Sequence, residues 1–93
     1  MSFDIIASRM GVTSTAVEQL ISGKVPMAVS SRLKVPTSSL QEFVDGGASI
    51  GVGHVIGCTP PQLQELRDVI GQKGAIGLLI GLCCRHTEGH TVA

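Results

Sequence analysis

The chain has very few aromatic side chains and no net charge. Its 93 residues include no tryptophan or tyrosine, and Phe3 and Phe43 are its only phenylalanines. A hydrophobic core must therefore be built from aliphatic side chains, which bury less area each than aromatic rings. Seven basic residues balance seven acidic ones. No overall field attracts the chain to nucleic acid or acidic lipid, and little charge repulsion opposes its association with other proteins.

Long apolar runs and secretory features are also lacking. The longest apolar run, residues 75–84, has about half of the roughly 20 residues that span a bilayer. Asp4 stands where a secretory signal would be basic, and no cleavage site follows an apolar run. The three cysteines are odd in number, and two of them are adjacent, so they do not indicate a disulfide framework. We therefore expect a cytoplasmic protein with reduced thiols and no membrane span.

What the sequence does contain is a pattern that recurs at a fixed interval. Residues 17–20, 40–43 and 63–66 each place a Glu/Gln pair between two apolar residues. Upstream and downstream of these segments, Val12 corresponds to Val35 and Gly23 to Gly46. A fixed period of this size is typical of one helical hairpin used several times.

The local signals predict helices and no strands. Apolar residues recur at helical spacing between glycines and prolines, and no alternating strand pattern is found. Helix starts are indicated by capping boxes at Thr15 and Ser38, and by Thr59 followed by Pro60. We predict an all-α protein of short helical hairpins with an internal repeat of about 23 residues. It is packed as an orthogonal bundle of about six or seven helices, with one domain over residues 1–84 and a flexible tail over 85–93.

The last predicted helix, from about Lys73 to Cys84, is apolar nearly all round. Such a helix needs to be covered by other helices or by a second chain. Gly77 and Gly81, four residues apart, form a smooth stripe that permits close helix contact. The predicted self-association surface consists of Ile76, Gly77, Leu78, Leu79, Ile80, Gly81 and Leu82. A charged residue in place of Leu79 is expected to break the resulting oligomer.

Residues 6–23 resemble the helix-turn-helix of Cro-type phage repressors. Ala7 stands where two helices cross, Gly11 at the turn, and apolar residues at the positions that lock the pair. The resemblance implies a DNA-facing set of residues, namely Arg9, Thr13, Ser14, Thr15, Glu18, Gln19 and Lys24. The helix that would read DNA has no basic residue, however, and the same apolar positions suit the core of a purely structural hairpin.

A second resemblance covers residues 6–33. Arg9-Met10-Gly11-Val12, Leu20-Ile21 and Val25-Pro26 are similar to the signature of the YidB-like family, which consists of small, uncharacterised, all-helical bacterial proteins. This resemblance implies a helical fold and a role in assembly or interaction. It brings no catalytic residues.

Metal binding and catalysis have weaker support. Cys83, Cys84, His86 and His90 are soft or borderline metal ligands, and His54 and Cys58 could join them, but their spacing matches no structural zinc module. The alternative is a pair of buried cysteines followed by a polar tail. No nucleotide-binding glycine motif or catalytic constellation is present. We expect no enzyme activity, cofactor, metal or small-molecule substrate.

Two functions are favoured over a third, in which the apolar, cysteine-containing C-terminus is a processed or membrane-active peptide behind a helical leader. The first is a non-enzymatic helical module for protein interaction, with a second copy of the chain or another protein as partner. The alternative is a helix-turn-helix regulator that binds DNA. Duplex binding that weakens steeply with salt would favour the regulator.

Overall fold

The computed structural model describes the backbone of residues 3–92 and the side chains of residues 3–85. These residues form six helices and no strand, which confirms the all-α prediction. The helices are α1 (Asp4–Met10), α2 (Ser14–Ile21), α3 (Met27–Leu33), α4 (Thr37–Val44), α5 (Ile50–Ile56) and α6 (Pro60–Val92).

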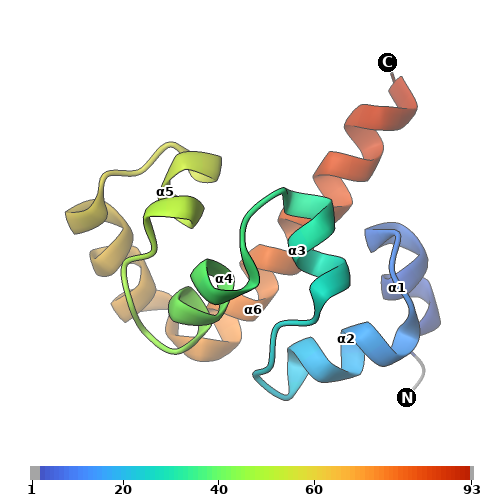
Figure 1. Cartoon of the computed structure of the whole chain (residues 1–93), viewed down its shortest axis with the longest axis horizontal. Helices are drawn as coiled ribbons and strands as arrows, with labels where there is room; N and C mark the ends of the chain where they lie inside the picture. Colours follow the sequence, from blue (N-terminus) through green and yellow to red (C-terminus); the bar gives the residue numbers. More distant parts are fainter. Residues whose placement is uncertain (1–2, 93) are drawn as a thin grey trace.

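Five short helices are followed by one long helix. In Figure 1 the hairpins follow one another across the molecule, from α1 and α2 on one side to α5 and the start of α6 on the other. The odd-numbered helices begin at residues 4, 27 and 50, and the even-numbered helices begin at residues 14, 37 and 60. In both sets, each helix therefore begins 23 residues after the previous helix of the same set.

The turns inside the hairpins share one backbone conformation. Gly11, Lys34 and Gly57 each follow an odd-numbered helix with a φ of 75°, 57° and 78° respectively. This left-handed conformation ends a helix and lets the chain reverse. Lys34 is the only non-glycine residue among those described with a positive φ.

Two predicted helix starts are wrong by two residues. Thr13, not Thr15, caps α2, because its extended backbone lets its side chain accept a hydrogen bond from the Ala16 N–H at 3.2 Å. α4 follows Pro36, not Ser38, since the ring of this proline holds φ near a value that suits the start of a helix. The third predicted start is correct. The Gln62 side chain accepts a hydrogen bond from the Thr59 N–H at 2.9 Å, as in a capping box.

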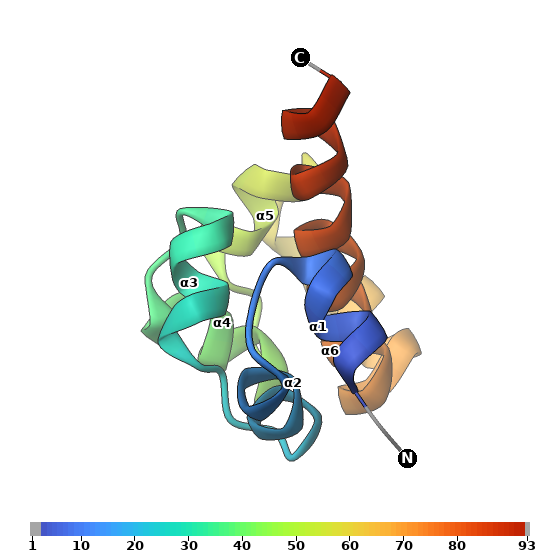
Figure 2. The same ribbon diagram turned by 90° about the vertical axis from the view of Figure 1, so that its right-hand side faces the viewer.

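α6 bends at Gly71, whose φ of 70° and ψ of −178° are not helical. The bend separates an N-terminal half, residues 60–70, from a C-terminal half, residues 72–92. The sequence pattern predicts two separate helices here, with the second ending at Cys84, whereas the helical backbone continues to Val92. The predicted boundary between domain and tail therefore falls within α6, and the end of the helix projects beyond the rest of the molecule (Figures 1 and 2).

The core lies between the hairpins and α6. α6 packs most extensively against α1, α3 and α4, and it also touches α2 and α5. Figure 2 shows its C-terminal half running beside α1. The largest fully buried side chains come from α1, α2, α4 and both halves of α6, and include Met10, Leu20, Phe43, Leu63 and Leu79. Among the described helices, none has a stretch that is both long and apolar enough to cross a lipid bilayer.

Candidate interaction surfaces

The C-terminal half of α6 has an inner face that belongs to the core. Ala75, Leu79 and Cys83 have no exposed surface, and Ile76 is 7% exposed. These four residues lie on one side of the helix because successive members are separated by one, three or four positions. Ile76 and Leu79 belong to the predicted self-association surface, but both are buried against other parts of their own chain.

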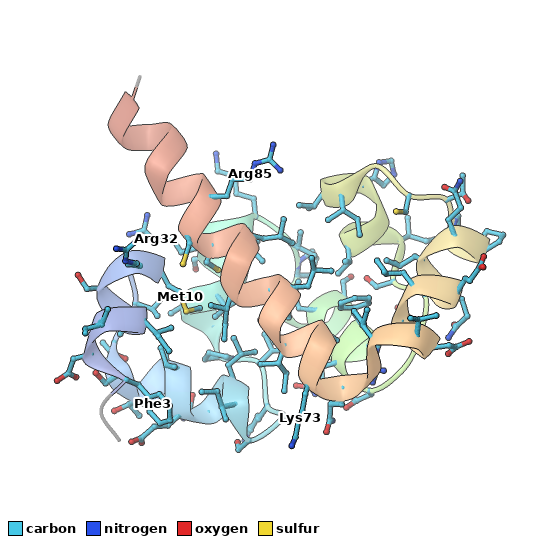
Figure 3. All side chains as sticks on the ribbon, turned by 180° about the vertical axis from the view of Figure 1, so that it is seen from behind. Phe3, Met10, Arg32, Lys73 and Arg85 are labelled. Carbon is cyan, nitrogen blue, oxygen red and sulfur yellow. The ribbon has the colours of Figure 1, made fainter. Side chains whose placement is uncertain are left out.

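The opposite side, which we call the outer face, is formed by the exposed residues Lys73, Gly77, Gly81 and Arg85. In Figure 3 this half of α6 crosses the near side of the molecule, and Lys73 and Arg85 mark the two ends of the face. At Gly77 and Gly81 no heavy atom lies within 4 Å of the point where a Cβ would stand. Each glycine thus opens onto free space.

Between the two faces lie the other predicted self-association residues. Leu78, Ile80 and Leu82 are partly buried and pack against the core cluster. The seven predicted residues therefore divide into buried, half-buried and exposed positions. Only Gly77 and Gly81 belong to the outer face.

Two glutamine side chains join consecutive hairpins. The Gln41 amide donates to the Gly23 carbonyl at 2.8 Å, and its oxygen accepts from the Val25 N–H at 2.9 Å. The Gln64 amide donates to the Gly46 carbonyl at 2.9 Å. The predicted capping box of Ser38, which would use Gln41, is wrong, because the Gln41 side chain reaches the segment between α2 and α3 that links the first two hairpins.

Arg67 makes the other polar junction, which was not predicted from the sequence. Although it is charged, it is only 8% exposed, and its guanidinium donates to the carbonyls of Phe43 at 2.7 Å and Val44 at 2.8 Å. These carbonyls lie at the end of α4, where the regular helical hydrogen bonds stop, and Phe43 has only the Gly46 N–H at 3.2 Å as a backbone donor. A signal was present, since Arg67 falls at helical spacing from Leu63 and Ile70, inside their apolar stripe.

The helix-turn-helix candidate forms a packed hairpin of α1 and α2. Six of its seven predicted DNA-facing residues are exposed and Ser14 is half-buried, so the structure leaves this surface open. Thr13, however, caps α2, and the Ser14 hydroxyl donates a hydrogen bond to the Asp4 carboxylate. Asp4 therefore stands at the N-terminus of α2, and Glu18 is exposed on the same helix. Both carboxylates oppose the approach of phosphates.

The candidate metal ligands are only partly described. Burial, reinforced by Cys84 and opposed by Arg32, raises the pKa of the Cys83 thiol to about 11. Cys83 therefore stays protonated at neutral pH, whereas metal binding requires a thiolate. The side chains of His86 and His90 lie outside the described residues. Over the part of the chain whose side chains are described, no three His, Cys, Asp or Glu residues are grouped to hold a metal ion.

One pocket of about 360 Å³ lies between α5 and the start of α6. His54 and Cys58 line it, together with backbone and small side chains from residues 49–60. His54 is exposed and Cys58 is half-buried. Among the residues that line this pocket there is no carboxylate or amide side chain to orient the imidazole.

Comparison of the chain with models of protein families, with curated proteins and with solved structures found no match in any of the three. The resemblances to the YidB-like family and to Cro-type repressors therefore stay predictions. Any function has to be argued from the surfaces described above.

Proposed function

We propose that this chain is a non-enzymatic helical module that binds a second copy of itself through the outer face of α6. The observation that carries the proposal is the position of Gly77 and Gly81. Both are exposed in mid-helix, and both face free space. Each glycine weakens the helix by about 1 kcal/mol relative to alanine, and no contact within the described structure makes use of the missing side chain.

A second helix could use the space that the missing side chains of Gly77 and Gly81 leave on the outer face. Two helices approach most closely where small residues four positions apart let the backbones meet. Leu78, Ile80 and Leu82 flank the glycines and are only partly buried, so they can close around such a contact. We therefore place a pair of α6 helices at the centre of the dimer, related by a two-fold axis that uses the same surface twice.

The charge of the chain supports a copy of itself as partner. Seven basic residues balance seven acidic ones, so the whole molecule has no strong field that would select a basic or an acidic partner. The outer face has charges only at its ends, at Lys73 and Arg85. Its centre can therefore be buried without removing a charge from water.

We further infer that the three hairpins are copies of one structural unit. This inference is supported by the even spacing of the helix starts and by the left-handed turns at residues 11, 34 and 57. It is also supported by Gln41 and Gln64, whose separation in the chain equals that of Gly23 and Gly46, the glycines that they bind. In this scheme the third hairpin differs from the first two because its second helix, α6, is longer and extends across both of them.

The test is the oligomeric state of two matched variants. Gly81→Glu places a charge at the centre of the outer face, where its side chain has room in the monomer. Ser31→Glu adds the same charge at an exposed position of α3 and serves as the control. In sedimentation equilibrium we expect Gly81→Glu to weaken dimerisation at least tenfold and Ser31→Glu to leave it unchanged. Equal behaviour of the two variants would refute the proposal.

DNA binding is the alternative. It is supported by the open surface of α1 and α2 and is opposed by Asp4 and Glu18. A mobility-shift assay at low salt separates the alternatives, because binding to duplex DNA that weakens steeply with salt is expected only of the regulator.

A further inference from the structure

Gly71 bends α6 through its backbone conformation alone. Its φ of 70° combined with a ψ of −178° lies in a region that is almost restricted to glycine. No heavy atom lies within 4 Å of the point where a Cβ would stand, so packing does not require a small residue here. No proline follows Pro61 in α6. A rotation at this one residue would therefore join the two halves into a continuous helix.

The two halves are attached to the molecule in different ways. The N-terminal half buries Leu63 in the core and is also fixed by directional hydrogen bonds from Gln64 to Gly46 and from Arg67 to the end of α4. The C-terminal half contributes the inner face, whose aliphatic side chains and Cys83 fill the core beside α1 and α3. Apolar burial has no fixed direction and can be satisfied by an identical surface on another molecule.

A continuous α6 would be too long to fold back onto its own chain. Its 33 residues would extend about 50 Å at the rise of an α-helix. The longest dimension of the molecule is 34 Å. With the N-terminal half held in place, straightening would carry the C-terminal half away from α1 and α3 and expose its inner face.

We propose that Gly71 is the hinge through which two copies of the chain exchange the C-terminal half of α6. In the exchanged dimer each inner face fills the space beside α1 and α3 of the other copy. The same core contacts are made as in the monomer, and the two forms differ mainly at the hinge. The partner is the same as in the proposed function, but the exchange uses the inner face and does not depend on the outer face.

The exchange also gives a role to the buried and half-buried residues of the predicted self-association segment. In the closed monomer Ile76 and Leu79 are buried within their own chain. In the exchanged dimer these two residues pack against the other copy, and so do the half-buried residues beside them. Five residues of the segment would then lie between the two copies, whereas Gly77 and Gly81 would stay on the outer face.

The test replaces the hinge residue and uses a second glycine as control. Gly71→Ala strains the bent form and favours the continuous helix. Gly57→Ala introduces an alanine at another positive φ, 78°, again with no neighbour within 4 Å, but at the end of α5. The oligomeric state is measured by size exclusion with light scattering. We expect Gly71→Ala to raise the association constant of the dimer at least tenfold and Gly57→Ala to leave it unchanged. A monomeric Gly71→Ala protein would overturn the exchange.

A double variant separates this proposal from the proposed function. Gly71→Ala combined with Gly81→Glu keeps the hinge substitution but places a charge on the outer face. The exchanged dimer should persist in the double variant, whereas a dimer formed through the outer face should be lost. Loss of the dimer would overturn the exchange and leave the outer-face proposal standing.

A refolding measurement covers the case in which Gly71→Ala does not fold. The Gly81→Glu protein, refolded from denaturant at high concentration, should yield a dimer that dissociates over hours after dilution, because reversal requires the C-terminal half to leave the core. Refolding to monomer alone, or a dimer that dissociates at once, would contradict the exchange.

Discussion

The two halves of α6 are covalently continuous and both bury apolar side chains in the core, but they differ in the polar contacts that hold them. The N-terminal half is anchored by polar side chains that bind backbone carbonyls of preceding segments, through Gln64 and Arg67. The C-terminal half is anchored mainly by the burial of its inner face, while Gly77 and Gly81 leave its outer face bare. Polar bonds specify one position, whereas apolar faces can also be used by a second molecule. This difference makes the C-terminal half the part of the chain best suited to association.

The largest expected effect tests the inner face. Leu79→Ala removes a side chain with no exposed surface and leaves a cavity in the core. We expect it to lower the free energy of unfolding by about 4 kcal/mol, measured by urea denaturation. The position is therefore unsuited to the charged substitution suggested by the sequence, since a charge at Leu79 would unfold the chain rather than only separate an oligomer. A loss below about 1 kcal/mol would show that the inner face is not part of the core.

A smaller effect tests the polar anchoring of the N-terminal half. Arg67→Met keeps an apolar stem of similar length but removes both donors to the Phe43 and Val44 carbonyls. The Val44 carbonyl would lose its donor and the Phe43 carbonyl would keep only the Gly46 N–H, which is expected to cost about 3 kcal/mol in chemical denaturation. Arg85→Met, at an exposed position of the C-terminal half, is the control and should change stability by less than about 0.5 kcal/mol. Equal losses in both variants would remove the contrast between the halves.

The smallest effect is a pH dependence within the inner face. Burial raises the pKa of Cys83 to about 11 from its ordinary value of 9.0, so the folded chain holds the thiol proton more tightly than the unfolded chain. The stability that this proton contributes is complete below about pH 9 and is lost as the pH rises toward 11. We expect a loss of about 2 kcal/mol over this window.

The control for this prediction is Cys83→Ala, in which the steep part of the pH dependence should disappear. The chain contains no tyrosine, so no phenol titrates in the same window. Parallel curves for the two proteins would show that Cys83 is not desolvated.

Local signals predicted most of the fold. Helical spacing of apolar residues, together with glycine stops and proline starts, indicated the helices, and Thr59 with Gln62 gave a correct helix start. The errors at Thr15 and Ser38 arose because several residues in a row could act as caps. The backbone conformation of Thr13 and Pro36, which the sequence does not reveal, decides between them.

The interaction surfaces were less predictable because they depend on contacts between hairpins. The loop partners of Gln41 are 16 and 18 residues away in the chain, and the partners of Arg67 are 23 and 24 residues away, so no local pattern identifies them. The sequence also placed seven consecutive residues on one surface, whereas helical geometry turns Leu79 inward and Gly77 and Gly81 outward. Periodicity locates an apolar helix, but the packing of its neighbours decides which side stays free.

The most direct measurement is sedimentation equilibrium of the unmodified chain over a wide range of concentrations. If a second copy binds the glycine-lined side of α6, the mass should rise from monomer to dimer with concentration and return to monomer on dilution. A mass that stays monomeric at every concentration would contradict the claim that this chain functions by binding itself.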